Sequence, residues 1–219
     1  MKSPFSSIQF FATALLAAVF AFSAPIVCAA ANPSGDPAPE LVNTFNSVVD
    51  MVLGQSPDAI TAKVPEIRAK MSDTFAIEAI VRRAFGKNWA KLTPTQQSEA
   101  TDLLGRLVIR TYATQLSTGE RPVIKIVSSK LIAPERWEVV STASQQGKTV
   151  NVVYRFAPFD GKWKVYDVLA ENVSVVGNYR QQFDEHFQSK SADDLLKILR
   201  DKLAAPVPTP TPAPQKANP

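Results

Sequence analysis

The sequence predicts an α+β fold in which helices pack on a twisted antiparallel sheet of four to five strands. Apolar residues recur every three or four positions between residues 40 and 116, which is typical of amphipathic helices. From residue 123 to residue 168 apolar and polar residues alternate, which is typical of strands buried on one face. Helical spacing returns after residue 173. Because the segments between the strands are short, we expect a meander of antiparallel neighbours.

The first part of the chain is predicted to form three helical segments. A helix over 40–53 ends at Gly54, a residue that commonly terminates helices. Ser56-Pro57 then provides a capping residue followed by proline at the first helical position, so a second helix is expected through Ile60. A further helical piece is predicted over 64–71.

Two longer helices follow. The segment 75–85 has apolar residues on one side and charged residues on the other, and Gly86 ends it. Thr93 and Gln96 have the spacing of a capping box, which predicts a helix over 94–116. The inward stripe of this helix is expected to contain Leu103, Leu104, Leu107, Val108, Thr111, Tyr112 and Leu116.

Four strands are predicted, over 123–131, 137–142, 149–156 and 162–168. Asp160-Gly161, immediately before the fourth strand, is a strong signal for a tight hairpin. Alternation places four residues on one face of the third strand: Val150, Val152, Tyr154 and Phe156. A helix with its apolar residues between 173 and 183, and a last helix capped by Ser191, complete the predicted domain.

The N-terminal 31 residues have the features of a secretory signal peptide. Lys2 is followed by an apolar run over 8–24 and then by small residues. We expect cleavage after Ala29 or Ala31, with an uncleaved anchor as the alternative, although the run is shorter than the roughly 20 residues that a membrane span needs. The sequence thus predicts an exported protein.

Three further regions complete the predicted domain organisation. Residues 32–39 are rich in turn formers and are expected to form a leader loop, 40–203 to form the globular domain, and 204–219 to form a disordered proline-rich tail. Cys28, the only cysteine, lies in the predicted signal peptide, so the mature chain is expected to contain no thiol or disulfide. Val27 before it disfavours lipidation, because a lipoprotein signal needs a small residue there.

The composition and the motifs exclude several functional classes. The net charge is only +4, and basic residues are spread along the chain rather than clustered, which argues against a nucleic-acid partner. There is no cluster of metal ligands, no phosphate-binding glycine loop and no nucleophile elbow, so we predict no metal, no cofactor and no catalytic residue. His186 is expected on the surface, and the pair Asp167 and Glu171 is the best candidate for acid–base chemistry.

Three stretches resemble a known family: FGKNWAKLTPTQQ over 85–97, TYATQL over 111–116, and the segment 163–183, which begins WKVYDV and ends NYRQQF. In order and spacing they are similar to the MlaC/toluene-tolerance family of periplasmic phospholipid-binding proteins, the soluble carriers of the Mla ABC transport system. The likeness extends over about 41–203. Asn172 stands where that family usually has glycine, and asparagine tolerates a left-handed turn better than most residues.

The resemblance implies a monomeric periplasmic carrier that holds phospholipid acyl chains in an apolar cavity between sheet and helices, with the headgroup at its mouth. It also implies two partners, an inner-membrane Mla-type transporter complex and an outer-membrane lipoprotein or porin complex. From this likeness and the face assignments, we expect the lipid-binding lining to consist of Val108, Tyr112, Ile124, Val139, Val152, Tyr154, Val165, Tyr166, Val173, Val175 and Phe183.

Other functions remain compatible with the sequence. A carrier of another lipid, such as a hopanoid or isoprenoid, would need the same kind of cavity. An exported enzyme on a similar helix-covered sheet would need an acid or base inside it. A structural envelope protein would have a solid core instead. Composition and periodicity alone do not separate an ordinary core from a cavity.

Overall fold

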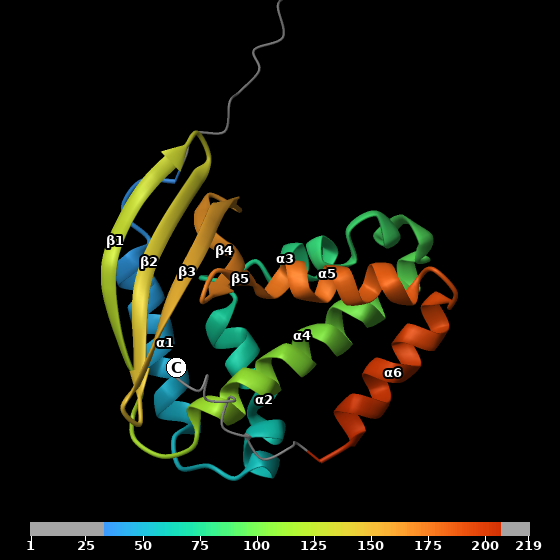
Figure 1. Ribbon diagram of the computed structural model, residues 1–219, viewed down its shortest axis with the longest axis horizontal. Helices are drawn as coiled ribbons and strands as arrows, with labels where there is room; N and C mark the ends of the chain where they lie inside the picture. Colours follow the sequence, from blue (N-terminus) through green and yellow to red (C-terminus); the bar gives the residue numbers. More distant parts are fainter. Residues whose placement is uncertain (1–32, 207–219) are drawn as a thin grey trace, which may run out of the picture. The chain divides into compact units, whose positions relative to one another are not determined.

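The computed structural model describes residues 33–206 (Figure 1). They form helices packed on one antiparallel sheet of five strands, which confirms the predicted α+β class. The helices are α1 (Ala38–Val52), α2 (Pro57–Met71), α3 (Ile77–Phe85), the 3₁₀ helix η1 (Gly86–Lys91), α4 (Pro94–Leu116), α5 (Val175–His186) and α6 (Ala192–Ala204). The strands are β1 (Val123–Ala133), β2 (Arg136–Gln145), β3 (Lys148–Phe159), β4 (Lys162–Ala170) and β5 (Val173–Ser174). The predicted signal peptide and most of the predicted tail lie outside the described residues.

The sheet is the expected meander. Each strand pairs antiparallel with the next, in the order β1-β2-β3-β4-β5. Asp160 and Gly161 have φ values of 51° and 73°, as a type I′ hairpin turn requires. The pairing of β3 with β4 shifts between Arg155 and Phe156, because Asp167 pairs with Arg155 whereas Val165 pairs with Phe156. Tyr166 is the extra residue of this bulge, and the alternation of β4 changes there.

The structure corrects the prediction for α2. The segments expected over 57–60 and 64–71 are one continuous helix that contains Pro65. A proline removes one backbone hydrogen bond from a helix interior. However, Ile60, Val64 and Ile67 are all buried on one side of α2, in a cluster shared with α1 and α4. Packing of this stripe therefore maintains the helix across the proline.

The start of α3 is also corrected, from Phe75 to Ile77. Phe75 instead forms a parallel bridge with Val165 of β4. The Val165 N–H donates to the Thr74 carbonyl at 2.8 Å, and the Ala76 N–H donates to the Val165 carbonyl at 3.0 Å. These bonds join the α2–α3 connection to β4 and compete with the first helical turn.

The longest helix, α4, has the predicted bounds. The Thr93 hydroxyl accepts from the Gln96 N–H at 3.2 Å, and the Gln96 side chain accepts from the Thr93 N–H at 2.9 Å, so the predicted capping box is confirmed. With 23 residues the helix is about 35 Å long, and it contacts α1, α2, α3 and α6.

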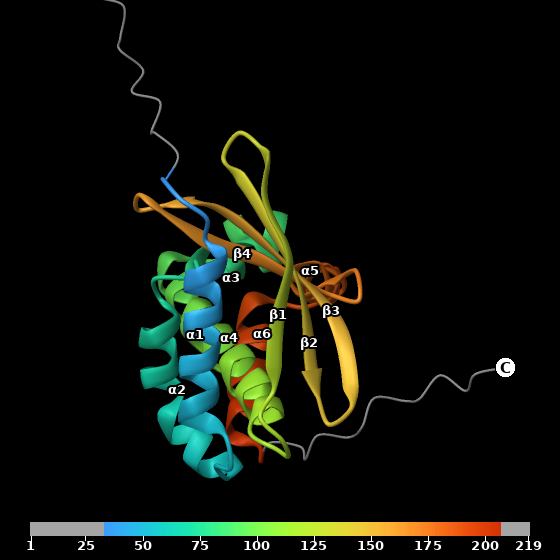
Figure 2. The same cartoon turned by 90° about the vertical axis from the view of Figure 1, so that its left-hand side faces the viewer.

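Three clusters of buried side chains surround the inner face of the sheet. One joins α3, α4, α5 and α6, another joins α1 to β2, β3 and β4, and the third joins α1, α2 and α4. Figure 2 shows α1, α2 and α4 on the same side of strands β1–β3. Within residues 33–206 no helix is both long enough and apolar enough to cross a membrane.

The described part of the predicted leader loop is fixed to the sheet. The Trp163 indole N–H donates to the Pro33 carbonyl at 2.9 Å. Asp36 accepts from the Ser129 hydroxyl at 2.5 Å and from the Ala38 N–H at 2.8 Å. These bonds connect the segment before α1 to β1 and β4 and set the position of α1 along the sheet.

Candidate functional site

A cavity of about 600 Å³ lies between the sheet and the helices. This volume is within the roughly 300–1,000 Å³ that is usual for ligand pockets. The sheet contributes mainly apolar side chains to it: Ala143, Val150, Val152, Tyr154 and Val168. The helices contribute a larger apolar set, including Leu41, Phe45, Val48, Ile67, Met71, Ile77, Ile80, Leu104, Val108, Ile109, Tyr112, Val175, Val176 and Tyr179. Most of the lining is therefore apolar, as an apolar ligand requires.

Polar residues gather at one end of this cavity: Gln115, Ser144, Gln145, Gln146 and Lys148. Here the β2–β3 hairpin is fastened to the α4–β1 connection, because the Gln145 side-chain amide donates to the Thr118 and Glu120 carbonyls at 2.9 and 3.0 Å. Gly119, in this connection, has φ +77°, a backbone conformation that glycine adopts without strain, so glycine is favoured at this position.

The phenol of Tyr154 lies in the sheet wall and is 9% exposed. Burial raises its pKa to about 12, against the opposing effect of a hydrogen bond with Ser141. The side chain is therefore neutral at physiological pH, and its aromatic ring adds to the apolar surface of the cavity.

The Asp167 carboxylate, at the junction of β4 and α5, borders the cavity and is 7% exposed. The Ser174 hydroxyl lies 2.9 Å from each of its oxygens, and the Val176 N–H donates to it at 3.4 Å. The Arg155 guanidinium is 3.8 Å away. A carboxylate beside the first turn of a helix is also favoured by the helix dipole. Asp167 belongs to the pair that was the best acid–base candidate in the sequence, and these contacts engage its carboxylate. They also hold the start of α5 against β4.

The described residues offer little other reactive chemistry. Within 33–206, no group of three or more His, Asp or Glu side chains is placed to hold a metal ion. The second member of the carboxylate pair, Glu171, accepts from the Asn151 N–H. His186 is half-buried rather than fully solvated, and its Nε2 lies 2.9 Å from the Ser191 carbonyl at the start of α6.

The structure brings together five of the eleven residues predicted to line a lipid site. Val108, Tyr112, Val152, Tyr154 and Val175 all border the large cavity. Val173 instead borders a smaller pocket next to it, and its side chain is 61% exposed. The other five do not line the cavity: Ile124, Val139, Val165, Tyr166 and Phe183.

The five residues away from the cavity have identifiable packing roles. Val139 and Val165 are fully buried in the cluster that joins α1 to the sheet, and Ile124 packs against that cluster. Phe183 faces helices rather than the sheet, with its ring centre 4.6 Å from that of Phe85. Tyr166, at the bulge in β4, lies near two cations outside the cavity.

The Tyr166 ring is covered by two guanidinium groups, those of Arg83 on α3 and Arg136 on β2. Their central carbons are 4.4 and 5.6 Å from the ring centre. Cations within about 6 Å of an aromatic face are attracted to it. We expected both Val165 and Tyr166 to line the cavity, but neighbouring residues of a strand point to opposite faces, and the structure places neither in the lining.

Much of the helical wall was missing from the predicted lining. Leu41, Phe45 and Val48 of α1 border the cavity, as do residues of α2 and α3. The apolar stripe of 40–53 was a usable signal, because it had to be buried against some partner. The sequence did not indicate that part of this stripe faces a cavity and the rest faces solid core.

Comparison with known proteins supplies the family. The family model described as MlaC protein matches residues 42–201. This chain belongs to the MlaC family. A solved structure with the same fold is the phospholipid-binding protein from Ralstonia solanacearum in complex with a phospholipid. The two chains are 24% identical, with a TM-score of 0.68, and the match covers 78% of this chain and 98% of that one. Among curated proteins none matches this chain.

Proposed function

We propose that this MlaC-family protein is a periplasmic phospholipid carrier. It holds the acyl chains in the cavity between sheet and helices and shuttles lipid between an inner-membrane Mla-type transporter complex and an outer-membrane complex. The observation that carries this proposal is the apolar cavity of about 600 Å³, open to solvent and bordered by α1 to α5 and the sheet. Membership of the MlaC family and the phospholipid in the Ralstonia solanacearum structure support it.

The physical case for a carrier rests on the free energy of exposing acyl chains to water. Two chains contain roughly 30 methylenes, and at about 0.8 kcal/mol each their exposure is unfavourable by more than 20 kcal/mol. Transfer from a bilayer into an apolar cavity is much closer to neutral. The carrier then needs no energy source of its own, and the membrane complexes determine the direction of transport.

The arrangement favours binding over catalysis. Most of the lining is apolar, with polar side chains gathered at the β2–β3 end, and the Asp167 carboxylate that borders the cavity is engaged by Ser174, Val176 and Arg155. General acid–base catalysis needs a group within hydrogen-bond reach of the reacting atom. A ligand held by its acyl chains would meet mainly methyl and methylene groups in this cavity.

The direct test is native mass spectrometry of the full chain expressed with its own export signal and purified without detergent. We expect one phospholipid bound per protein, identified by fragmentation after organic extraction. Protein that carries no lipid, or that carries a hopanoid or isoprenoid in place of a phospholipid, would contradict the proposal.

A pair of matched variants tests whether the lipid binds in this cavity. Val108 borders the cavity from α4, and Val108→Trp would fill part of it. Val140, half-buried on β2 between Ser128 and Val153, provides the control Val140→Trp. The first variant is expected to lose most of its bound lipid, and the second to retain it. Equal retention by both folded variants would place the lipid elsewhere.

A further inference from the structure

A second, smaller pocket lies beside the large cavity. Its volume is about 260 Å³, and it is formed by α4, α5, α6 and the β4–β5 region. Four residues border both spaces: Tyr112, Ala170, Val175 and Tyr179. The two spaces are therefore adjoining, and a single ligand could extend from one into the other. We call the smaller space the vestibule.

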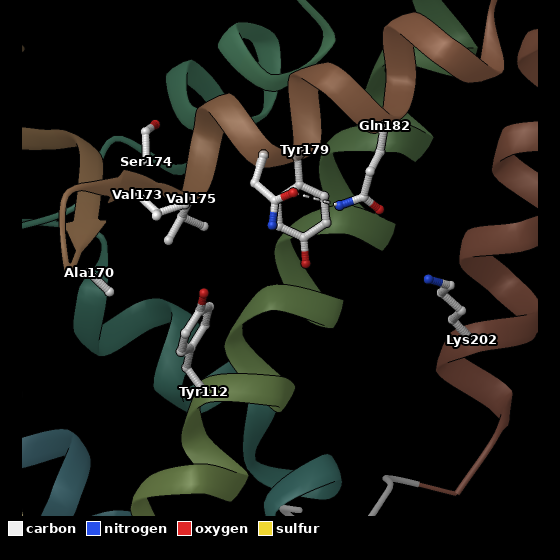
Figure 3. A pocket seen from close by; sticks show the side chains of 9 residues that line it. Tyr112, Ala170, Val173, Ser174, Val175, Tyr179, Gln182 and Lys202 are labelled. Atoms are coloured by element: carbon white, nitrogen blue, oxygen red, sulfur yellow. Dashed lines mark hydrogen bonds between the residues drawn. The ribbon is translucent and has the colours of Figure 1, made fainter. Parts of the chain in front are cut away.

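The vestibule differs from the cavity in its chemistry. Besides Ala170, Val173 and Val175 it is lined by hydroxyl, amide and amino groups: Tyr112, Ser174, Asn178, Tyr179, Gln182 and Lys202. Figure 3 shows the Lys202 amino group directed into it from α6 and the Tyr112 hydroxyl directed into it from α4. Among residues 33–206 no carboxylate borders the vestibule directly, and Lys202 is the charged side chain that lines it, while the Asp167 carboxylate lies behind Ser174, 2.9 Å from that hydroxyl.

The two tyrosines at the boundary with the cavity remain neutral hydrogen-bond donors. Burial raises the pKa of the Tyr112 and Tyr179 phenols, and the proximity of Tyr112 raises that of Tyr179 further. A neutral hydroxyl can donate to an anionic oxygen, whereas a phenolate would repel it. Because Tyr112 and Tyr179 border both spaces, their rings can contact an acyl chain in the cavity while their hydroxyls donate to a polar headgroup in the vestibule.

Lys202 is held at this place by its backbone rather than by its side chain. Arg110 of α4, only 5% exposed, donates to the Lys202 carbonyl at 2.6 Å and to the Leu203 carbonyl at 2.7 Å. Arg110 and Tyr112 are two residues apart on the same helix, so α4 sets the positions of both Lys202 and Tyr112. Within residues 33–206, no carboxylate lies within salt-bridge distance of the Lys202 amino group.

We infer that the vestibule is a phosphate subsite, in which Lys202 pairs with the phosphate of a lipid headgroup while the acyl chains occupy the cavity. This inference rests on the proposed carrier function and adds a headgroup requirement to it. Lys148, at the polar end of the cavity beside the β2–β3 hairpin, is the competing cation. Its neighbour Gln145 is already engaged by the α4–β1 connection, whereas the vestibule offers two tyrosine hydroxyls beside its lysine.

The test measures preference for a phosphate-bearing lipid. Delipidated protein is loaded from an equimolar mixture of phosphatidylglycerol and diacylglycerol with the same acyl chains, and native mass spectrometry gives the ratio of the two complexes. Charge-assisted hydrogen bonds of this kind usually correspond to roughly a tenfold change in affinity or more. Lys202→Gln is therefore expected to reduce the preference for phosphatidylglycerol about tenfold, because phosphatidylglycerol presents a phosphate to Lys202 and diacylglycerol does not.

Two control variants complete the design. Lys197→Gln removes the same charge from the same helix at a position that pairs with Asp201 outside the vestibule, and it should leave the ratio unchanged. An unchanged ratio for Lys202→Gln, or a loss of preference only for Lys148→Gln, overturns the inference while the carrier function stands. If neither lipid binds to the wild type, the carrier function itself fails, and the subsite with it.

A last arm separates a lipid headgroup from a free phosphate compound. Glycerol 3-phosphate contains the phosphate but no acyl chains. In large excess it is expected not to displace bound phosphatidylglycerol from the wild type, because the cavity contributes most of the affinity. Displacement that disappears in Lys202→Gln would show a site for free phosphate esters and overturn the assignment to a lipid.

Discussion

At the scale of single residues, Tyr154 links the cavity to the stability of the protein at alkaline pH. In the folded chain its pKa is raised to about 12 by burial, whereas in the unfolded chain it is near the ordinary value of about 10. Between these values the unfolded chain loses a proton that the folded chain keeps. The free energy of unfolding therefore decreases as pH rises through this window, by at most about 3 kcal/mol from this group.

The measurement is urea unfolding of the wild type and of Tyr154→Phe at several values between pH 9 and pH 12. Lysines titrate in the same range, so only the difference between the two proteins reports on Tyr154. We expect the stability of the wild type relative to the variant to decrease as pH rises. A difference that stays constant over the whole range would mean that this phenol ionises equally easily in both states.

At single positions the sequence was predictive where a backbone conformation, such as a positive φ, favours particular residue types. Asn172 adopts φ 65°, consistent with an asparagine at a position where the related family has glycine. Asp160-Gly161 forms the expected turn. The bulge at Tyr166 was not predictable, because its cause is the pairing of β3 with β4 and not any local preference of Tyr166. One inserted residue reverses which face a side chain occupies.

At the scale of elements, Arg110 joins α4 to the end of α6. Its guanidinium donates to the carbonyls of Lys202, Leu203 and Ala205, at 2.6, 2.7 and 3.3 Å. The last carbonyls of a helix have no partner within the helix, and a cation there also interacts favourably with the helix dipole. Burial lowers the pKa of Arg110, followed by repulsion from Arg106, but arginine stays charged in proteins.

We expect Arg110→Met to lower the free energy of unfolding by roughly 2–4 kcal/mol, because three carbonyls at the end of α6 lose their donor together. The matched control is Arg106→Met, one turn earlier on α4, whose guanidinium is 46% exposed and pairs with Asp102. Exposed pairs contribute at most about 1 kcal/mol. Denaturant unfolding of both variants makes the comparison, and equal effects would show that the Arg110 contacts add little.

Elements were predicted best where their start and end signals are local. The capping box at Thr93 predicted the start of α4, and the predicted bounds of this helix are confirmed. The prediction failed for α2 because the proline rule is local, whereas the packing that maintains the helix through Pro65 comes from α1 and α4. It failed at the start of α3 for the same reason. Thr74 and Ala76, on either side of Phe75, form backbone hydrogen bonds with Val165 of β4, which lies 90 residues beyond Phe75 in the chain.

At the scale of the whole molecule, alternation along the third strand predicted part of the sheet wall of the cavity. Alternation along β3 identifies Val152 and Tyr154 as facing the covered side, and both border the cavity. Helical periodicity identifies an apolar stripe but not its partner. The stripe of α1 therefore divides between the cavity, at Leu41 and Phe45, and the solid core, at Val49 and Val52, in a way that only the assembled helices determine.

Removal of a bound lipid tests whether a ligand in the cavity stabilises the whole fold. A ligand that binds only the folded state, at about a hundred times its dissociation constant, stabilises that state by roughly 2.7 kcal/mol. For a domain of this size each kcal/mol shifts the thermal midpoint by about 2–4 °C. Delipidated protein is therefore expected to melt about 5–10 °C below the lipid-loaded form, because the cavity walls lose their apolar partner.

Differential scanning calorimetry of the lipid-loaded and delipidated protein measures this shift. Val108→Trp provides the internal control, since its side chain fills part of the same cavity and the variant should show a much smaller difference between the two preparations. Delipidated wild type that melts at the same temperature as the loaded form would contradict the carrier function. A full shift that persists in Val108→Trp would instead place the stabilising lipid outside the cavity.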